Sequence, residues 1–166
     1  MILKSIFETQ YLALIALGSN LGDSRALIHR AFKRLQAFSE EPILCSSLWK
    51  TAPVDCPPGS PDFLNAAAAL VPRSDESPET LLAKLQNLEG EFGRRTKTIL
   101  NEARPLDLDL IAFADQIRDT TELILPHPRA HQRAFVLRPL AEIVPEFVLP
   151  GQKLSIAQLL ERMHDQ

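Results

Sequence analysis

Two carboxylates stand one residue apart in an otherwise apolar run. Asp107 and Asp109 lie within the segment Arg104-Pro-Leu-Asp-Leu-Asp-Leu-Ile-Ala-Phe113. If this segment is a β-strand, both aspartates project from one face while the leucines between them enter the core. Carboxylates this close repel each other, and a proton or a cation relieves the repulsion. Mg²⁺ suits such oxygen ligands and points to a phosphate-bearing substrate, whereas a strand with a simply solvated outer face is the alternative.

Cationic side chains surround the aspartates along the chain. Arg94 and Arg104 flank one loop that leads into the aspartate segment, and His127 and Arg133 follow it. Guanidinium groups present planar donors suited to phosphate oxygens, and a histidine can donate to phosphate or move a proton. The pattern suits phosphoryl transfer, in which cations offset the charge of the phosphates. Ordinary surface ion pairs and a structural histidine in a turn are the alternatives.

A proline-rich loop is flanked by aromatic residues. Residues 51–61 hold four prolines and one glycine, and the loop is longer than chain connectivity requires. Long loops of this kind often cover binding sites. Trp49 precedes the loop and Phe63 follows it, so that together with Phe135 they offer aromatic faces to a flat heterocycle. Packing in the core is the alternative for each of them.

Hydrophobic periodicity and turn signals predict the elements that must position these residues. Strands are expected at 12–17, 43–50, 63–71 and in the aspartate segment, and helices from 23 or 24 to about 38 and from 77 to 93. The order β-α-β-β-α-β is that of the split βαβ unit. The fold class is therefore α+β with a ferredoxin-like core: an antiparallel sheet with helices on both faces, in three α-β-α layers.

Shorter elements are expected beyond this unit. Strands are predicted at 116–118 and 122–125, and a helix at 132–137 is expected to stop before Pro139. A last helix is predicted to begin at Ser155, because Ser155 and Gln158 have capping-box spacing.

Composition predicts a single globular domain spanning residues 1–166. Hydrophobic content of 45% and charged content of 23% are ordinary for such a protein. The net charge of −3 argues against nucleic-acid binding. The apolar run 11–17 follows Glu8 and Gln10 rather than a basic cluster, so a core strand is favoured over a targeting segment. No stretch reaches the length of a membrane span, and a cytoplasmic monomer is expected.

Seven motifs follow one another along nearly the whole chain. They are Ala16-Leu-Gly-Ser-Asn-Leu-Gly22, Ser47-Leu-Trp-Lys-Thr-Ala-Pro53, Asp62-Phe-Leu-Asn-Ala66, Glu89 with Gly93-Arg94, Arg104-Pro-Leu-Asp-Leu-Asp109, Leu125-Pro-His-Pro-Arg129 and Arg133-Ala-Phe-Val-Leu-Arg-Pro-Leu140. In order and spacing they resemble the 6-hydroxymethyl-7,8-dihydropterin pyrophosphokinases of the folate pathway. The resemblance implies Mg²⁺-dependent transfer of diphosphate from ATP to the hydroxymethyl group of the reduced pterin, which yields AMP.

The resemblance also implies a role for each matching residue. Two Mg²⁺ ions are assigned to Asp107 and Asp109, and catalysis to these aspartates with Arg94 and Arg104. ATP contacts are assigned to Glu89, Arg94, Arg104, Leu110, His127 and Arg133. Pterin contacts are assigned to Thr51, Pro53, Val54, Phe63, Asn65, Asp107 and Phe135.

The chain departs from the family pattern mainly in the loop before the aspartates. Glu102-Ala103 stands where Gly-Pro is usual, Asn101 where tryptophan is common, and Asp55 replaces an expected glycine. Two alternatives therefore accompany the family assignment. One is a noncatalytic pterin- or nucleotide-binding homologue, and the other is a different two-metal nucleotide-using enzyme on a ferredoxin-like fold.

Overall fold

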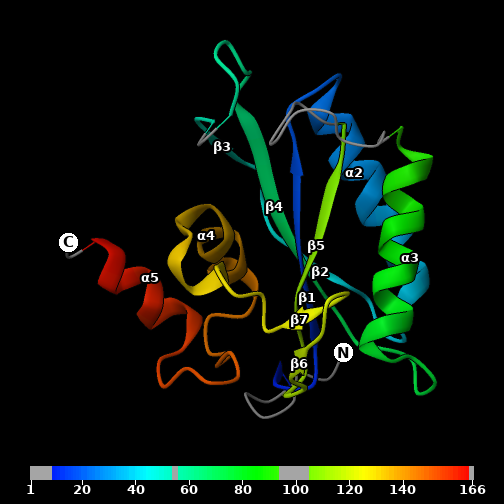
Figure 1. Ribbon diagram of the computed structural model, residues 1–166, viewed down its shortest axis with the longest axis vertical. Coiled ribbons are helices and arrows are strands. Elements are labelled where there is room, and N and C mark those ends of the chain that lie inside the picture. Colours follow the sequence, from blue (N-terminus) through cyan, green and yellow to red (C-terminus); the bar gives the residue numbers. More distant parts are fainter. Residues whose placement is uncertain (1–8, 54–55, 94–104, 165–166) are drawn as a thin grey trace.

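A five-stranded antiparallel sheet forms the centre of the molecule (Figure 1). The computed structural model describes residues 9–53, 56–93 and 105–164. The strands are β1 (Ala13–Ser19), β2 (Leu44–Cys45), β3 (Trp49–Thr51), β4 (Phe63–Leu70) and β5 (Asp107–Phe113). Their order is β2-β4-β1-β5, with β3 also paired to β4. With β2 and β3 counted as one interrupted strand, this is the predicted split βαβ order.

Helices cover both faces of the sheet, as predicted (Figure 1). Helices α2 (Ser24–Leu35) and α3 (Pro78–Glu91) pack on one face. Helix α4 (Ala134–Ile143) packs on the other face, and α5 (Ile156–His164) packs against α4. Because both faces are covered, β1 is apolar from Ala13 to Leu17: Ile15 enters the core under α2 and α3, and Leu14 enters the core under α4.

The helix starts follow from capping residues that the sequence shows. The Asp23 carboxylate accepts a hydrogen bond from the Ala26 N–H at 3.2 Å. Ser77 forms a capping box with Thr80 at the start of α3, and Ser155 exchanges hydrogen bonds with Gln158 at the start of α5. These side chains satisfy N–H groups that have no partner within the helix.

Two predicted boundaries are wrong. The strand expected at 43–50 is interrupted because the Ser46 hydroxyl, not a backbone carbonyl, accepts the Ala67 N–H at 2.8 Å. Helix α4 does not stop before Pro139 but continues through it to Ile143. Proline removes one helical hydrogen bond, but Pro139 lies buried with Leu137 and Leu140, and this packing holds the helix together.

A small hairpin after β5 positions the following residues. Strands β6 (Arg118–Asp119) and β7 (Ile124–Leu125) pair with each other, close to both predicted ranges. The chain then returns to the sheet, where the His127 N–H donates to the Ile111 carbonyl at 2.8 Å. A 3₁₀ turn, η2 (Ala130–Gln132), leads into α4, and a second, η1 (Gln36–Phe38), extends α2.

Candidate active site

A glycine of β1 lies between an amide of β4 and a carboxylate of β5. In the strand register, Gly18 of β1 stands opposite Asn65 of β4 on one side and opposite Asp107 of β5 on the other. Directly paired residues direct their side chains to the same face, and neighbouring strands lie about 4.8 Å apart. A Cβ atom at Gly18 would lie 3.4 Å from Asn65 Oδ1. The glycine therefore leaves open space between the amide and the carboxylate.

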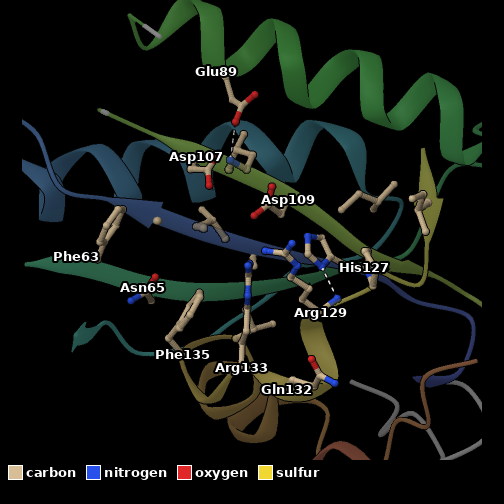
Figure 2. A pocket seen from close by; sticks show the side chains of 18 of the residues that line it. Phe63, Asn65, Glu89, Asp107, Asp109, His127, Arg129, Gln132, Arg133 and Phe135 are labelled. Atoms are coloured by element: carbon tan, nitrogen blue, oxygen red, sulfur yellow. Dashed lines mark hydrogen bonds between the residues drawn. The ribbon is translucent and has the colours of Figure 1, made fainter. Parts of the chain in front are cut away.

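Asp107 and Asp109 project from the α4 face of β5, as the alternation of the sequence predicts. Both are half-buried, while Leu108 between them is buried in the core on the opposite face. Opposite Asp109 on β1 stands Ala16, whose side chain is also small. The two carboxylates thus face the same open region, toward which Arg133 and His127 extend (Figure 2).

This region is a cavity of about 1090 Å³. It is bounded by the sheet, by α3 and by the segment from 121 to 136. The predicted site residues that line it are Thr51, Phe63, Asn65, Glu89, Asp107, Asp109, Leu110, His127, Arg133 and Phe135. Pro53 is described but is not among the lining residues, whereas its neighbour Ala52 is. Arg94, Arg104 and Val54 lie outside the described residues.

One end of the cavity combines aromatic faces with an amide. Phe63 and Phe135 lie near Asn65, which is buried and donates through Nδ2 to the Thr51 hydroxyl at 2.6 Å (Figure 2). This hydrogen bond fixes the orientation of the amide. Trp49, the third predicted aromatic wall, is not among the described residues that line the cavity; its indole N–H donates to Glu142 instead.

The other end is cationic. The Arg133 guanidinium lies 5.5 Å from the centre of the Phe135 ring, a cation–π distance. Burial, together with Arg133 and Arg129, lowers the pKa of His127, and Asp107 opposes that change. His127 is therefore neutral at pH 7. Its Nδ1 accepts the Arg129 N–H at 3.2 Å, which places the proton on Nε2, the nitrogen left to donate to a ligand.

Comparison with known proteins gives the family. The family model of 7,8-dihydro-6-hydroxymethylpterin-pyrophosphokinase (HPPK) matches residues 14–145. The chain is 36% identical over 154 residues to the 2-amino-4-hydroxy-6-hydroxymethyldihydropteridine pyrophosphokinase of Haemophilus influenzae, covering 92% of this chain and 93% of that protein. The protein of the same name from Bacillus subtilis is 38% identical over 133 residues, and this match covers 80% of this chain and 77% of the Bacillus protein. The chain belongs to the HPPK family.

Solved structures support the fold. A crystal structure of an HPPK-DHPS protein in complex with substrates superposes with a TM-score of 0.73 at 12% sequence identity. The match covers 93% of this chain but only 43% of that longer one. Family membership confirms the predicted enzyme class, an ATP-dependent pyrophosphokinase, over the alternative of an unrelated two-metal enzyme. Within the part of the chain that the structure describes, no helix is long and apolar enough to cross a membrane.

Sequence reasoning missed two residues of this site. Gly18 was identified only as part of the motif Ala16–Gly22, although its lack of a side chain opens the cavity floor. Arg129 was identified only as the last residue of the motif Leu125–Arg129, without a role, and it lines the cavity next to the histidine (Figure 2). For Arg129, the available signal in the sequence was its position two residues after His127.

Glu89 contacts the strand that bears the aspartates. Its side chain, on α3, is buried and accepts the Leu108 N–H at 2.8 Å through Oε2 (Figure 2). Because β5 stands at the end of the strand order, this carboxylate satisfies an N–H at the sheet edge, between Asp107 and Asp109. The predicted ATP contact of Glu89 is thus joined by a structural hydrogen bond.

We expect Glu89→Ala to lower the free energy of unfolding by about 1–3 kcal/mol, because the Leu108 N–H loses its buried acceptor. Glu89→Gln keeps an acceptor oxygen and should lose less. Urea denaturation measures both. Glu91→Ala, on the same helix at an exposed ion pair with Arg34, is the control with a smaller expected change. An equal loss in the Glu89→Ala and Glu91→Ala proteins would contradict this role.

The lowered pKa of His127 predicts a pH-dependent stability. As the pH falls below the ordinary value of 6.5, the unfolded chain binds a proton before the folded protein does, so the free energy of unfolding decreases. Above that pH the histidine is neutral in both states and contributes nothing. We expect His127→Gln to lose less stability than the wild type between pH 7.5 and pH 5.5 in urea denaturation with EDTA present. Identical pH dependence in the two proteins would refute the prediction.

Proposed function

We propose that this protein transfers diphosphate from ATP to the hydroxymethyl group of 6-hydroxymethyl-7,8-dihydropterin, yielding AMP and the pterin diphosphate for folate biosynthesis. The observation that supports this most strongly is the row Asn65, Gly18 and Asp107 across three strands. Asn65 provides an amide for the edge of a heterocycle, and Asp107 provides a carboxylate for the phosphates. Each lies on a strand next to Gly18, whose missing side chain leaves the position between them open. The family assignment and the lining of the cavity both suit this pair of substrates.

The proposed pterin end uses the fixed amide of Asn65. An amide both donates and accepts, as the edge of a pterin ring requires, and the Thr51 hydrogen bond holds it in one orientation. Phe63 and Phe135 supply faces for the flat ring. Pro53 and Val54 complete the proposed pterin contacts from the following loop.

The two aspartates fit Mg²⁺. This ion is usually bound by one or two carboxylates, with waters and substrate phosphates as its remaining ligands. Asp107 and Asp109 provide that set, and among the described residues no cluster of three or more His, Cys, Asp or Glu side chains forms a metal cage. We propose that they hold two Mg²⁺ ions, which when bound would withdraw charge from the phosphates and the attacking hydroxyl.

The cationic end is proposed to bind the polyphosphate. Arg133 and neutral His127 line the cavity, and Leu110 and Glu89 line it toward α3. In an in-line attack of the pterin oxygen on the β-phosphorus, guanidinium groups at this end stabilise the charge that moves onto the departing AMP. Arg94 and Arg104 are proposed to add to this stabilisation. We assign no general base.

Product analysis tests the proposal. Purified protein is incubated with ATP, the reduced pterin and Mg²⁺, and nucleotides and pterins are separated by chromatography. We expect AMP and pterin diphosphate in equal amounts, and none without Mg²⁺. Formation of ADP, or AMP without pterin diphosphate, would contradict the proposed reaction. Binding of both substrates without turnover would indicate the noncatalytic homologue. We also propose that the protein is a cytoplasmic monomer. Gel filtration tests its oligomeric state.

A further inference from the structure

One exposed carboxylate outside the cavity collects three hydrogen bonds from a single short segment. Glu142, on α4, accepts the Ser47 N–H at 3.2 Å through Oε2 and the Ser47 hydroxyl at 2.6 Å through Oε1. The indole N–H of Trp49 also donates to Oε1. Partial burial raises the pKa of Glu142, but these donors outweigh it and lower the pKa overall. The carboxylate is therefore ionised at neutral pH, which strengthens the three hydrogen bonds.

The segment that Glu142 holds is weakly supported by the sheet. Strand β3 has only three residues, Trp49–Thr51, and among the described strands it pairs with β4 alone. Short edge strands contribute few ladder hydrogen bonds and depend on contacts with other elements to stay in place. Ser46 interrupts the strand on the other side, so Ser47 and Trp49 lie where the ladder is weakest.

The same segment is in register with the proposed pterin end. Trp49 stands opposite Asn65, and Thr51 stands opposite Phe63. Thr51 in turn accepts the Asn65 amide N–H at 2.6 Å. A displacement of β3 would therefore move the hydroxyl that orients Asn65 and one wall of the cavity.

Helix α4 connects the two sides of this end of the cavity. Phe135 lies in its first turn and lines the cavity, and Glu142 lies seven residues later, about two turns along the same side of the helix. The helix thus presents an aromatic wall at one end and holds β3 at the other. The distance between Phe135 and Thr51 depends on this connection.

We infer that Glu142 is a positioning residue for the pterin: through Ser47 and Trp49 it holds β3 against α4, so that Thr51, Asn65 and Phe135 keep the spacing that accepts the ring. This inference rests on the proposed function. It predicts an effect on one substrate, because the cationic end that faces the nucleotide has no contact with β3 among the hydrogen bonds described above.

The test compares Glu142→Ala and Glu142→Gln with the wild type. We expect Glu142→Ala to raise the KM for the pterin about five- to tenfold, with kcat and the KM for ATP within about twofold of the wild type. Glu142→Gln keeps one acceptor oxygen for part of the three hydrogen bonds and should recover part of the pterin affinity. Glu146→Ala, an exposed carboxylate just beyond the same helix, is the matched control and should leave all three constants unchanged.

A direct signal for the contact is available because Trp49 is the only tryptophan in the chain. Its single indole N–H resonance in a ¹H–¹⁵N spectrum should move upfield in Glu142→Ala, where the carboxylate acceptor is lost. In Trp49→Phe the KM for the pterin should rise, and adding Glu142→Ala should raise it by less than the product of the two single effects.

The outcomes separate the inference from the proposed function. If the wild type neither binds the pterin in calorimetry nor forms its diphosphate, the proposed function fails. If the wild type does both and Glu142→Ala has an unchanged KM for the pterin, only the inference is overturned. An equal rise in both KM values together with a lower unfolding midpoint would also overturn it, because that result indicates a general structural role.

Discussion

Asp109→Asn is expected to lower the rate of AMP formation by about 10³-fold. The substitution keeps the size of the side chain but removes one of the two carboxylate charges that face the cavity from β5. A neutral amide binds Mg²⁺ weakly compared with a carboxylate, and the phosphates then lose the cation that offsets their charge. The measurement is the initial rate of AMP release at saturating ATP and pterin over a series of Mg²⁺ concentrations.

The same variant separates metal binding from folding. We expect calorimetric pterin affinity in metal-free protein to stay close to that of the wild type, because Asn65, Thr51 and Phe135 are unaltered. Asp115→Asn, the same chemical change at an exposed position two residues beyond β5, should retain full activity. A parallel loss of pterin affinity in metal-free Asp109→Asn would indicate a structural role for the aspartate.

The residues that sequence reasoning placed well are those whose geometry is local. The common face of Asp107 and Asp109 follows from the period of a single strand, and the caps at Asp23, Ser77 and Ser155 follow from contacts within three residues. Such features depend on no other part of the chain. The sequence therefore contains them in full.

The features that sequence reasoning missed depend on the pairing of distant segments. That Gly18 stands between Asn65 and Asp107 is a property of strand register, which no single segment determines. The contact of Trp49 with Glu142 joins residues 93 positions apart. The same contact explains why the Trp49 indole bonds to Glu142 and does not supply the predicted aromatic wall of the cavity.

The wrong boundaries have a related cause. Local rules stop a helix before Pro139 and continue a strand through Ser46, and both rules describe isolated segments correctly. In the folded chain, burial of Pro139 with its neighbours and the hydrogen bond from Ala67 to the Ser46 hydroxyl outweigh them. Tertiary contacts thus decided the cases in which local preference failed.

Arg133→Ala is expected to reduce kcat/KM for ATP about 100-fold. The guanidinium faces the cavity beside His127, where it would stabilise the charge on the phosphates, and alanine leaves that charge without this partner. The KM for the pterin should rise only about threefold, which corresponds to loss of the cation–π contact with Phe135. Steady-state kinetics with each substrate varied in turn separates the two effects.

Two further variants test whether charge or shape is responsible. Arg133→Lys keeps the charge but not the planar pair of donors, so we expect about a tenfold loss for ATP, between the wild type and Arg133→Ala. Arg162→Ala removes an exposed arginine from α5 and should leave both constants unchanged. If Arg133→Ala instead raised the KM for the pterin as much as it impaired the use of ATP, Arg133 would act mainly as a support for Phe135. The cationic end of the cavity would then have to be assigned to His127 and Arg129, which line it beside Arg133.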